Sequence, residues 1–159
     1  TLVKSSAASD VYKRQCIGSD VIVGFPGEDE LEFTETYNFL KSIDISYLHV
    51  FSYSERSNTS SIILNKKVSK IIKNERSKIL RELSNSKKLE FYKKNVNNHH
   101  NVLFETENKN GYIHGYTENY VRVKSLWSNS KQNKILNCYL DGIDRDFNCI
   151  AEQAVELKV

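Results

Sequence analysis

The sequence contains little cysteine and almost no proline, and it has no long apolar run. The three cysteines, Cys16, Cys138 and Cys149, are too few and too scattered for a disulfide framework. No apolar stretch approaches the length that spans a bilayer, and residues 1–15 lack the apolar core of a secretory signal. These absences exclude a disulfide-rich secreted domain and a membrane-spanning protein. They favour a reducing, cytoplasmic location.

The composition is typical of a soluble globular protein with one ordinary domain or two small ones. Hydrophobic residues make up 39% and charged residues 27% of the 159 residues. The net charge of +3 conceals a segregation, because residues 20–44 hold seven acids and one lysine, whereas residues 66–94 hold eleven Lys and Arg and three Glu. A basic block of this kind is either a solvated helix face or a nucleic-acid contact, and the sequence leaves both open.

Residues 20–53 predict one βαβ unit. Val21–Val23 is a short apolar run of the kind found in a strand buried on both faces, and Gly24–Gly27 then forms a turn. Residues 28–40 combine acids in the first turn with apolar residues at helical spacing, and residues 47–53 predict a second strand parallel to the first. Because one βαβ unit cannot cover its own faces, we expect it to be part of a larger α/β sheet.

Residues 66–96 predict a long helix that no proline interrupts. Its expected apolar side consists of Val68, Ile71, Ile72, Ile79, Leu80 and Leu83. Short alternating runs at 101–106, 112–124, 134–140 and 148–155 follow a polar hinge, and Asn110-Gly111 predicts a tight hairpin between the first two. We therefore expect a small antiparallel β-barrel after a domain boundary near residue 97.

Four stretches carry a resemblance to a known family. They are "IGSDVIVGFPGEDE", "ISYLHVFSYSERSNT", "KNERSKILRELSNSKKLEFY" and "GYIHGYTENYVRV". In this order the chain resembles the radical S-adenosylmethionine methylthiotransferases over about residues 16–145. The "TENYVRV" stretch is most similar to the branch that acts on threonylcarbamoyladenosine in tRNA. The resemblance implies that residues 16–97 are the last part of a partial (β/α) radical domain, and that residues 98–159 are a TRAM-like RNA-binding barrel.

The resemblance also implies a cofactor site, because the family's equivalent of Asp20–Gly24 lies beside the adenine of S-adenosylmethionine. The implied cofactor-binding residues are Ile22, Gly24, Pro26, Gly27, Glu28 and Arg56. The loop is not a phosphate-binding loop, because it lacks Gly-Lys-Ser/Thr and its carboxylates would repel phosphate. The residues alone leave other interpretations of it open. A plain structural turn, a helix-terminal role for Glu28 and an exposed salt bridge for Arg56 explain the same pattern.

The family's 4Fe–4S clusters need cysteine sets that this sequence does not contain. We therefore expect the full-length enzyme to use S-adenosylmethionine and 4Fe–4S clusters, and this chain to hold no cluster ligands and no metal and to be inactive alone. The three cysteines are expected to be small buried residues.

Residues 1–15 match nothing that follows them. "DVYKRQ" is what GAT GTG TAT AAG AGA CAG encodes, which resembles a transposase end sequence used in preparing sequencing libraries. We expect residues 1–15 to be an adapter-derived leader joined to a C-terminal fragment. A divergent native N-terminus is the alternative.

The predicted function follows from the resemblance. It is a tRNA methylthiotransferase that adds a methylthio group to threonylcarbamoyladenosine beside the anticodon by radical chemistry. The alternatives are a methylthiotransferase that acts on isopentenyladenosine tRNA or on a ribosomal protein, and a non-catalytic RNA-binding module. The predicted partner is tRNA.

The expected RNA contact lies on one face of the barrel. Strand alternation in "ENYVRVK" sends Val121 and Val123 to the core and sends Tyr120, Arg122 and Lys124 outward. An aromatic ring beside two exposed cations suits base stacking and phosphate neutralisation. Alternation on the preceding segment predicts that Tyr112, His114 and Tyr116 extend this surface. Ring packing on a neighbour, with solvated cations, is the alternative.

Overall fold

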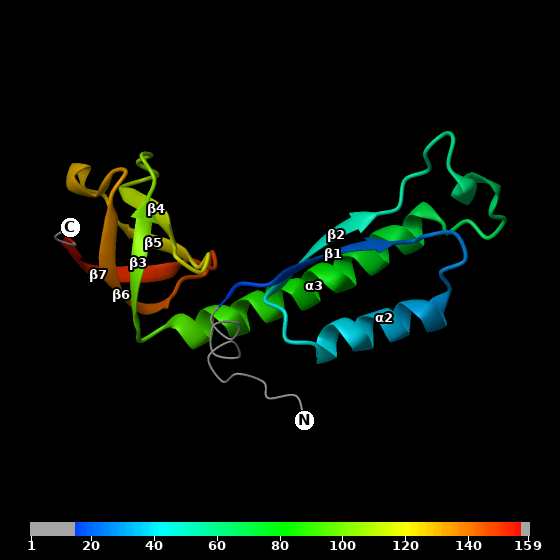
Figure 1. Ribbon diagram of the computed structural model, residues 1–159, viewed down its shortest axis with the longest axis horizontal. Coiled ribbons are helices and arrows are strands. Elements are labelled where there is room, and N and C mark those ends of the chain that lie inside the picture. Colours follow the sequence, from blue (N-terminus) through cyan, green and yellow to red (C-terminus); the bar gives the residue numbers. More distant parts are fainter. Residues whose placement is uncertain (1–14, 157–159) are drawn as a thin grey trace, which may run out of the picture. The chain divides into compact units, whose positions relative to one another are not determined.

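The computed structural model describes residues 15–156, so that nearly all of the expected leader lies outside the described residues. The chain forms two compact units, one of residues 17–88 and one that contains Cys16 and the chain from Leu89 onward. Each unit is described by itself, and both are labelled in Figure 1. Among the described residues, no helix is long and apolar enough to cross a membrane.

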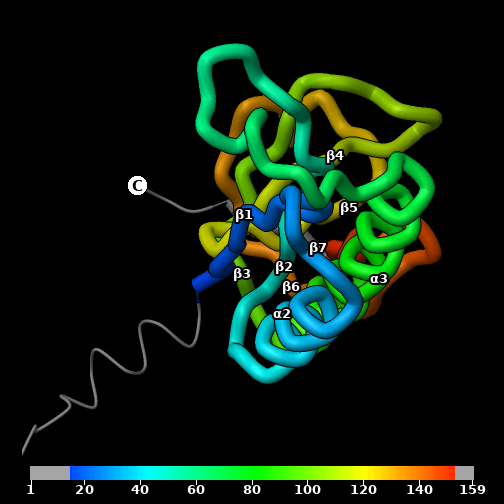
Figure 2. The backbone as a smooth tube through the Cα atoms, turned by 90° about the vertical axis from the view of Figure 1, so that its right-hand side faces the viewer, coloured from blue at the N-terminus to red at the C-terminus, as the bar shows by residue number. Residues whose placement is uncertain are grey.

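The unit of residues 17–88 is built on a βαβ motif. Strand β1 (Gly18–Val23) pairs in parallel with β2 (Tyr47–Ser52), and helix α2 (Glu30–Ser42) connects them. Figure 1 shows the two strands side by side, and Figure 2 shows the same backbone turned by 90°. Helix α2 begins at a capping box, in which Asp29 accepts the N–H groups of Leu31 and Glu32 while Glu32 accepts the N–H of Asp29. The predicted βαβ unit is confirmed.

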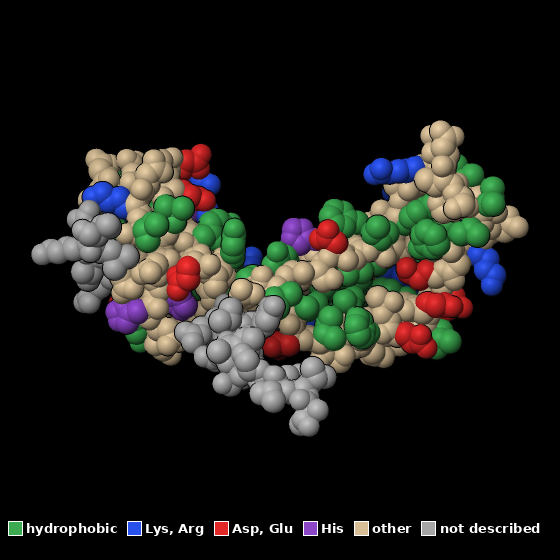
Figure 3. Space-filling view, in the orientation of Figure 1, with side chains coloured by type: hydrophobic (Ala, Val, Ile, Leu, Met, Phe, Trp, Pro, Cys, Tyr) green, Lys and Arg blue, Asp and Glu red, His purple; other side chains and the backbone are tan. Residues whose placement is uncertain are grey.

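Helices α2 and α3 (Lys70–Asn95) supply the buried side chains that cover one face of this small sheet. The core consists of Val23, Phe33, Leu40, Leu48, Leu80 and Leu83. On the opposite face, Ile22 lies beside Phe51 in the register, and the two are 59% and 51% exposed. Within the described residues the prediction of a strand buried on both faces is therefore wrong for Ile22, because no element packs on that side. Figure 3 shows hydrophobic side chains on the surface of this unit, at the right.

The buried stripe of α3 differs from the predicted apolar side. Leu80 and Leu83 are buried as predicted, but Ile71 is 73% exposed, and Ile72 and Ile79 are exposed as well. Polar residues take part in the stripe instead, namely Arg76, Ser77, Ser84, Lys87 and Asn95. Each of these side chains forms at least one hydrogen bond inside the fold: the Lys87 ammonium, for example, donates to the carbonyls of Lys41 and Ile43 at 3.2 and 2.8 Å. The segment before α3 contains a short 3-10 helix, η1 (Ser60–Ile63).

The second unit is a closed five-stranded barrel. Its strands are β3 (His99–Phe104), β4 (Tyr112–Thr117), β5 (Arg122–Leu126), β6 (Ile135–Ile143) and β7 (Cys149–Glu156), with a 3-10 turn, η2 (Asn129–Lys131), before β6. The strand order around the barrel is β3-β4-β5-β7-β6. The predicted barrel is confirmed. It is not wholly antiparallel, because β5 and β7 pair in parallel where the barrel closes.

The predicted hairpin at Asn110-Gly111 is confirmed. Both residues have positive φ, +55° and +83°, and Lys109 and Tyr112 exchange backbone hydrogen bonds of 2.8 and 3.1 Å across the turn. Two consecutive residues in the left-handed region give the type I′ turn that matches the twist of the flanking strands.

The barrel core confirms the predicted orientation of the valines. Val121 and Val123 are fully buried, and so are Cys138 and Cys149. The last turns of α3 close the same core with Phe91 and Tyr92. The Tyr92 hydroxyl accepts the N–H of Arg122 at 3.0 Å, and burial raises the pKa of Tyr92 to about 12. The C-terminal end of α3 thus holds the backbone of Arg122, the first residue of β5.

Candidate RNA-binding face and candidate ligand pocket

Aromatic rings and cations alternate on the outer surface of β4 and β5. We call this surface the tyrosine face; it consists of Tyr112, His114, Tyr116, Tyr120, Arg122 and Lys124. The strand register places Tyr116 opposite Arg122 and His114 opposite Lys124. The Arg122 guanidinium carbon lies 4.5 Å from the ring centroid of Tyr116, and the Lys124 ammonium lies 4.4 Å from that of Tyr112. Each cation is therefore held over an aromatic face.

Both cations are also paired with carboxylates of the barrel. Arg122 forms a bidentate pair with Glu105, with the two N···O distances at 2.5 and 2.9 Å, and Lys124 donates to Asp144 at 3.0 Å. The side chains of Arg122 and Lys124 are only 18% and 24% exposed. The expectation of two exposed cations is wrong, because acids on neighbouring segments neutralise them, and alternation along one strand does not reveal such partners.

Tyr120 reaches the face from a turn rather than from a strand. Thr117 and Val121 close this turn through hydrogen bonds, and Tyr120 has a φ of +63°. The single alternating run predicted over residues 112–124 is therefore two strands with a turn between them. The Tyr120 ring is 72% exposed, and its centroid lies 6.3 Å from that of Tyr116. The Asn119 side chain, which bonds back to Thr117, is the turn signal that sequence reasoning missed.

His114 lies half-buried between the two paired tyrosines of β4. Burial, followed by the charge of Arg122, lowers the pKa of His114 below its ordinary value of 6.5, so the ring is neutral at pH 7. A neutral imidazole adds a flat surface to the tyrosine face without adding charge.

A pocket opens at the carboxyl ends of β1 and β2. Its volume is about 370 Å³, and its lining residues are Ile22, Phe51, Ser52, Tyr53, Ser54, Arg56, Thr59 and Ser61. The structure thus brings together two of the predicted cofactor residues, Ile22 and Arg56. The carboxyl ends of parallel strands are where α/β sheets bind ligands, and this rule applied to β2 is the signal that would have added Phe51 and Tyr53.

The other predicted cofactor residues form the turn after β1 and do not line the pocket. Gly24 and Gly27 have φ values of +78° and +97°, which favour glycine. Pro26 lies between them and is buried. The carboxylate of Glu28 is engaged within the protein: it accepts the N–H of Gly24 at 2.9 Å and pairs with Arg76 at 2.7 Å.

The pocket combines an apolar surface with one cationic side chain. The exposed apolar side chains of Ile22 and Phe51 suit a flat, apolar group of a ligand. Arg56 is exposed at the rim, and no carboxylate among the described residues forms an ion pair with it, so its guanidinium suits the carboxylate of an amino-acid moiety.

The cysteines do not fit an iron–sulfur cluster. Cys138 and Cys149 point into the barrel core, and burial raises their pKa values to about 11 and 12, which keeps both thiols protonated. The prediction that these two are buried residues is confirmed. Cys16 is half-buried and packs against the same core. Within residues 15–156, no three His, Cys, Asp or Glu side chains are grouped as metal ligands.

Comparison with known proteins finds no matching family model. Curated relatives are found. A threonylcarbamoyladenosine tRNA methylthiotransferase of Aquifex aeolicus is 48% identical over 108 residues, which are 68% of this chain and 25% of the relative. The same enzyme of Bacillus subtilis is 43% identical over 112 residues. A tRNA-2-methylthio-N(6)-dimethylallyladenosine synthase of Syntrophus aciditrophicus is 36% identical over 121 residues, or 76% of this chain. The chain spans about a quarter of the length of these relatives.

Proposed function

The matched two thirds of this chain belong to the tRNA methylthiotransferase family, and on that premise we propose that the chain is part of an enzyme that adds a methylthio group to a modified adenosine of tRNA. The proposed substrate is threonylcarbamoyladenosine next to the anticodon. Two relatives named for that nucleoside, which are 48% and 43% identical to this chain over the matched residues, support this choice.

The barrel is the proposed tRNA-binding part, and the tyrosine face is the observation that carries this proposal. Tyr116 and Tyr120 present exposed rings beside one another, and unpaired bases stack on such rings. Arg122 orients the Tyr116 ring from one side and is itself held by Glu105. We propose that the tyrosines contact bases and that the paired cations hold the rings in place.

The pocket of the other unit is the proposed S-adenosylmethionine site, with Ile22 and Phe51 against the adenine and Arg56 toward the carboxylate. In the family this cofactor supplies the radical for the reaction. The cysteines of this chain do not fit the cluster, so we assign no ligand of it here. The residues of this chain bind and orient the cofactor and the tRNA.

The proposed tRNA contact is tested by variants of the tyrosine face. Tyr116→Leu and Tyr120→Leu remove a ring but keep an apolar side chain, and each should weaken tRNA binding by about 1–2 kcal/mol, roughly tenfold. Tyr→Phe at either position keeps the ring and should bind as the parent chain does. Tyr139→Leu is the control, because Tyr139 is a half-buried tyrosine on β6 that lies outside the face.

A second arm separates stacking from charge. Neutralising Arg122 and Glu105 together, as Gln, leaves the net charge of the face unchanged. We expect weaker tRNA binding with little change in its salt dependence, whereas each lost phosphate contact would reduce the salt slope by roughly one unit. Unchanged tRNA affinity at low salt in the Tyr116→Leu/Tyr120→Leu double variant would refute the tyrosine face as the tRNA contact.

A further inference from the structure

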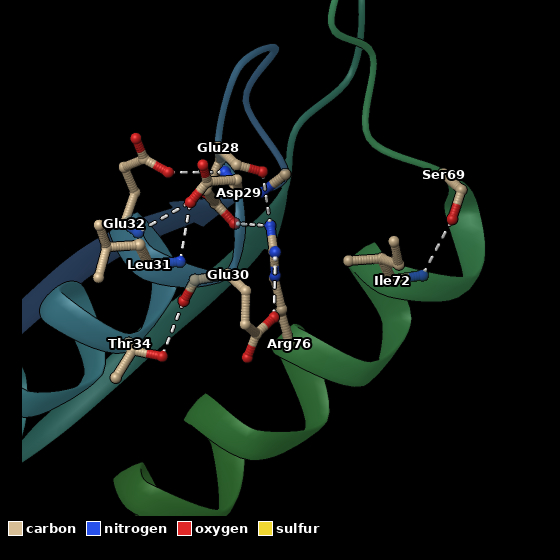
Figure 4. A network of polar contacts seen from close by, with 10 residues as sticks. Glu28, Asp29, Glu30, Leu31, Glu32, Thr34, Ser69, Ile72 and Arg76 are labelled. Atoms are coloured by element: carbon tan, nitrogen blue, oxygen red, sulfur yellow. Dashed lines mark hydrogen bonds and ion pairs between the residues drawn. The ribbon is translucent and has the colours of Figure 1, made fainter.

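The turn after β1 is fastened to helix α3 by a buried arginine. The side chain of Arg76 is 5% exposed, and one guanidinium nitrogen donates to both the backbone carbonyl and the carboxylate of Glu28, at 3.0 and 2.7 Å. The other terminal nitrogen lies 3.4 Å from the carboxylate of Glu30, and the guanidinium lies over the ring of Phe33. Figure 4 shows the contacts of Glu28 and Glu30 with Arg76.

Glu28 also contacts the backbone at the end of β1, so that it links Arg76 to the strand. Its second carboxylate oxygen accepts the N–H of Gly24 at 2.9 Å. Gly24 follows Val23, the last residue of β1, and has a left-handed φ of +78°. The contacts therefore run from α3 through one carboxylate to the backbone that leaves the strand, two residues beyond the pocket residue Ile22.

A second residue of α3 holds the segment after β2 in a similar way. The Lys73 ammonium donates to the carbonyl of Tyr53 at 3.1 Å and lies 5.2 Å from the centroid of its ring. Lys73 also packs against the turn, since a Cβ added to Gly24 would lie 2.4 Å from its Cγ. Tyr53 lines the pocket, and its hydroxyl donates to Ser61, another lining residue, at 2.7 Å.

The turn after β1 and the segment after β2, which we call the two loops of the pocket, thus both contact the first two turns of α3. One contact joins them directly: Phe25 of the first loop packs edge-on against Tyr53 of the second, with centroids 5.1 Å apart. Helix α3 supplies no pocket-lining residue itself. Its inward-facing cations contact the backbone of both loops, which a purely apolar helix face could not do.

We infer that Arg76, acting through Glu28, and Lys73, acting on Tyr53, are positioning residues that fix both loops of the pocket and so set its affinity. The inference rests on the proposed function in one respect, namely that the ligand is S-adenosylmethionine. The loops are held before the ligand arrives, so that less ordering is required on binding.

The first readout of the test does not depend on the ligand. Arg76→Met and Glu28→Gln remove the charge pair, and each should speed amide hydrogen exchange at Gly24 by about tenfold or more, because the acceptor of that N–H is no longer held. Arg81→Met is the matched control: Arg81 is exposed on the same helix, and exchange at Gly24 should not change. Arg76→Lys keeps the positive charge but loses the planar guanidinium with its two terminal nitrogens, and it replaces Arg76→Met in the test if that variant does not fold.

The second readout is the affinity of the 159-residue chain for S-adenosylmethionine in equilibrium dialysis. Arg76→Met and Lys73→Met should each weaken it by about tenfold. Leu80→Ala removes a fully buried side chain of α3 and lowers stability without touching either loop. Leu80→Ala should therefore leave the affinity of the folded fraction unchanged. If Arg76 only stabilised the fold, Arg76→Met would leave that affinity unchanged as well.

Two results overturn the inference: wild-type exchange at Gly24 in Arg76→Met and Glu28→Gln, or an affinity of Arg76→Met that falls no further than that of Leu80→Ala at equal folded fraction. A parent chain that binds no S-adenosylmethionine argues against the proposed cofactor site instead. In that case the exchange readout alone decides whether Arg76 positions the turn.

Discussion

Glu105 and Asp144 are the residues that hold the cations of the tyrosine face. The hydrogen bond from Arg122 lowers the pKa of Glu105 below its ordinary value of 4.5. For Asp144, burial raises the pKa, but hydrogen bonds from Asn148, Lys124 and Asp146 outweigh it, so the pKa lies below its ordinary value of 3.8. Both carboxyls are ionised at neutral pH and stabilise the folded barrel in that form.

A pH dependence of stability follows from these two carboxyls. A folded pKa below the unfolded one adds stability that is present above the unfolded pKa and is lost as the pH falls through the folded pKa. The free energy of unfolding of the barrel should therefore begin to fall as the pH drops toward 4.5 and should continue to fall below 3.8. Trp127, the only tryptophan, packs against the barrel core, and its fluorescence during urea unfolding provides the measurement.

Glu105→Gln should make this pH dependence shallower and should cost about 1 kcal/mol at pH 7, a small value because the Glu105 side chain is 40% exposed. Glu107→Gln is the control, since Glu107 and its partner Lys109 are both mostly exposed. A parallel loss of stability in both variants, or none in either, would contradict the role given to Glu105.

At the residue scale, the sequence predicted which side chains lie on the tyrosine face but not how they are held. Alternation along a strand sorts inward from outward residues, and it identified Val121 and Val123 correctly. Glu105 and Asp144 lie 17 and 20 residues from the cations that they pair with. Only the closed barrel brings such distant positions together, and neither spacing nor composition encodes that distance.

At the scale of elements, turns with a strong local signal were the most predictable. The Asn110-Gly111 turn was identified because its two residues tolerate positive φ, and this preference belongs to the residues themselves. The inner face of α3 was less predictable. Arg76 and Lys87 are buried on it because they reach backbone carbonyls of neighbouring elements, whereas Ile71 and Ile79 are exposed. Hydrophobic periodicity cannot predict these buried cations, because the carbonyls that accept their hydrogen bonds are brought to the helix only by the tertiary structure.

The hairpin turn gives a prediction about the stability of the β-barrel. Gly111→Ala places a Cβ at a φ of +83° and should lower the free energy of unfolding by about 1–2 kcal/mol, again followed by Trp127 fluorescence. Gly142→Ala is a matched control. An added Cβ meets nothing within 4 Å at either position, and Gly142 does not have the positive φ of Gly111. Equal losses in the two variants would show that conformational strain at the turn is not the cause.

At the scale of the whole molecule, the two units divide the proposed work. The unit of residues 17–88 carries the pocket that is proposed to bind the cofactor, and the barrel carries the tyrosine face. The identity to the relatives covers two thirds of this chain and a quarter of theirs. Ile22 and Phe51 lie exposed on the open face of the small sheet, where they line the pocket.

The most direct test of the proposed function is the nucleoside content of tRNA from cells in which the gene for this chain has been disrupted. Digested tRNA is analysed by liquid chromatography and mass spectrometry, which resolves the methylthio forms of threonylcarbamoyladenosine and dimethylallyladenosine from their precursors. The account predicts that 2-methylthio-threonylcarbamoyladenosine disappears while its unmethylthiolated precursor accumulates, and that the dimethylallyl form is unchanged. Loss of the dimethylallyl form alone would assign the chain to the other substrate. Wild-type levels of both methylthio nucleosides would contradict the assignment of this chain to a tRNA methylthiotransferase.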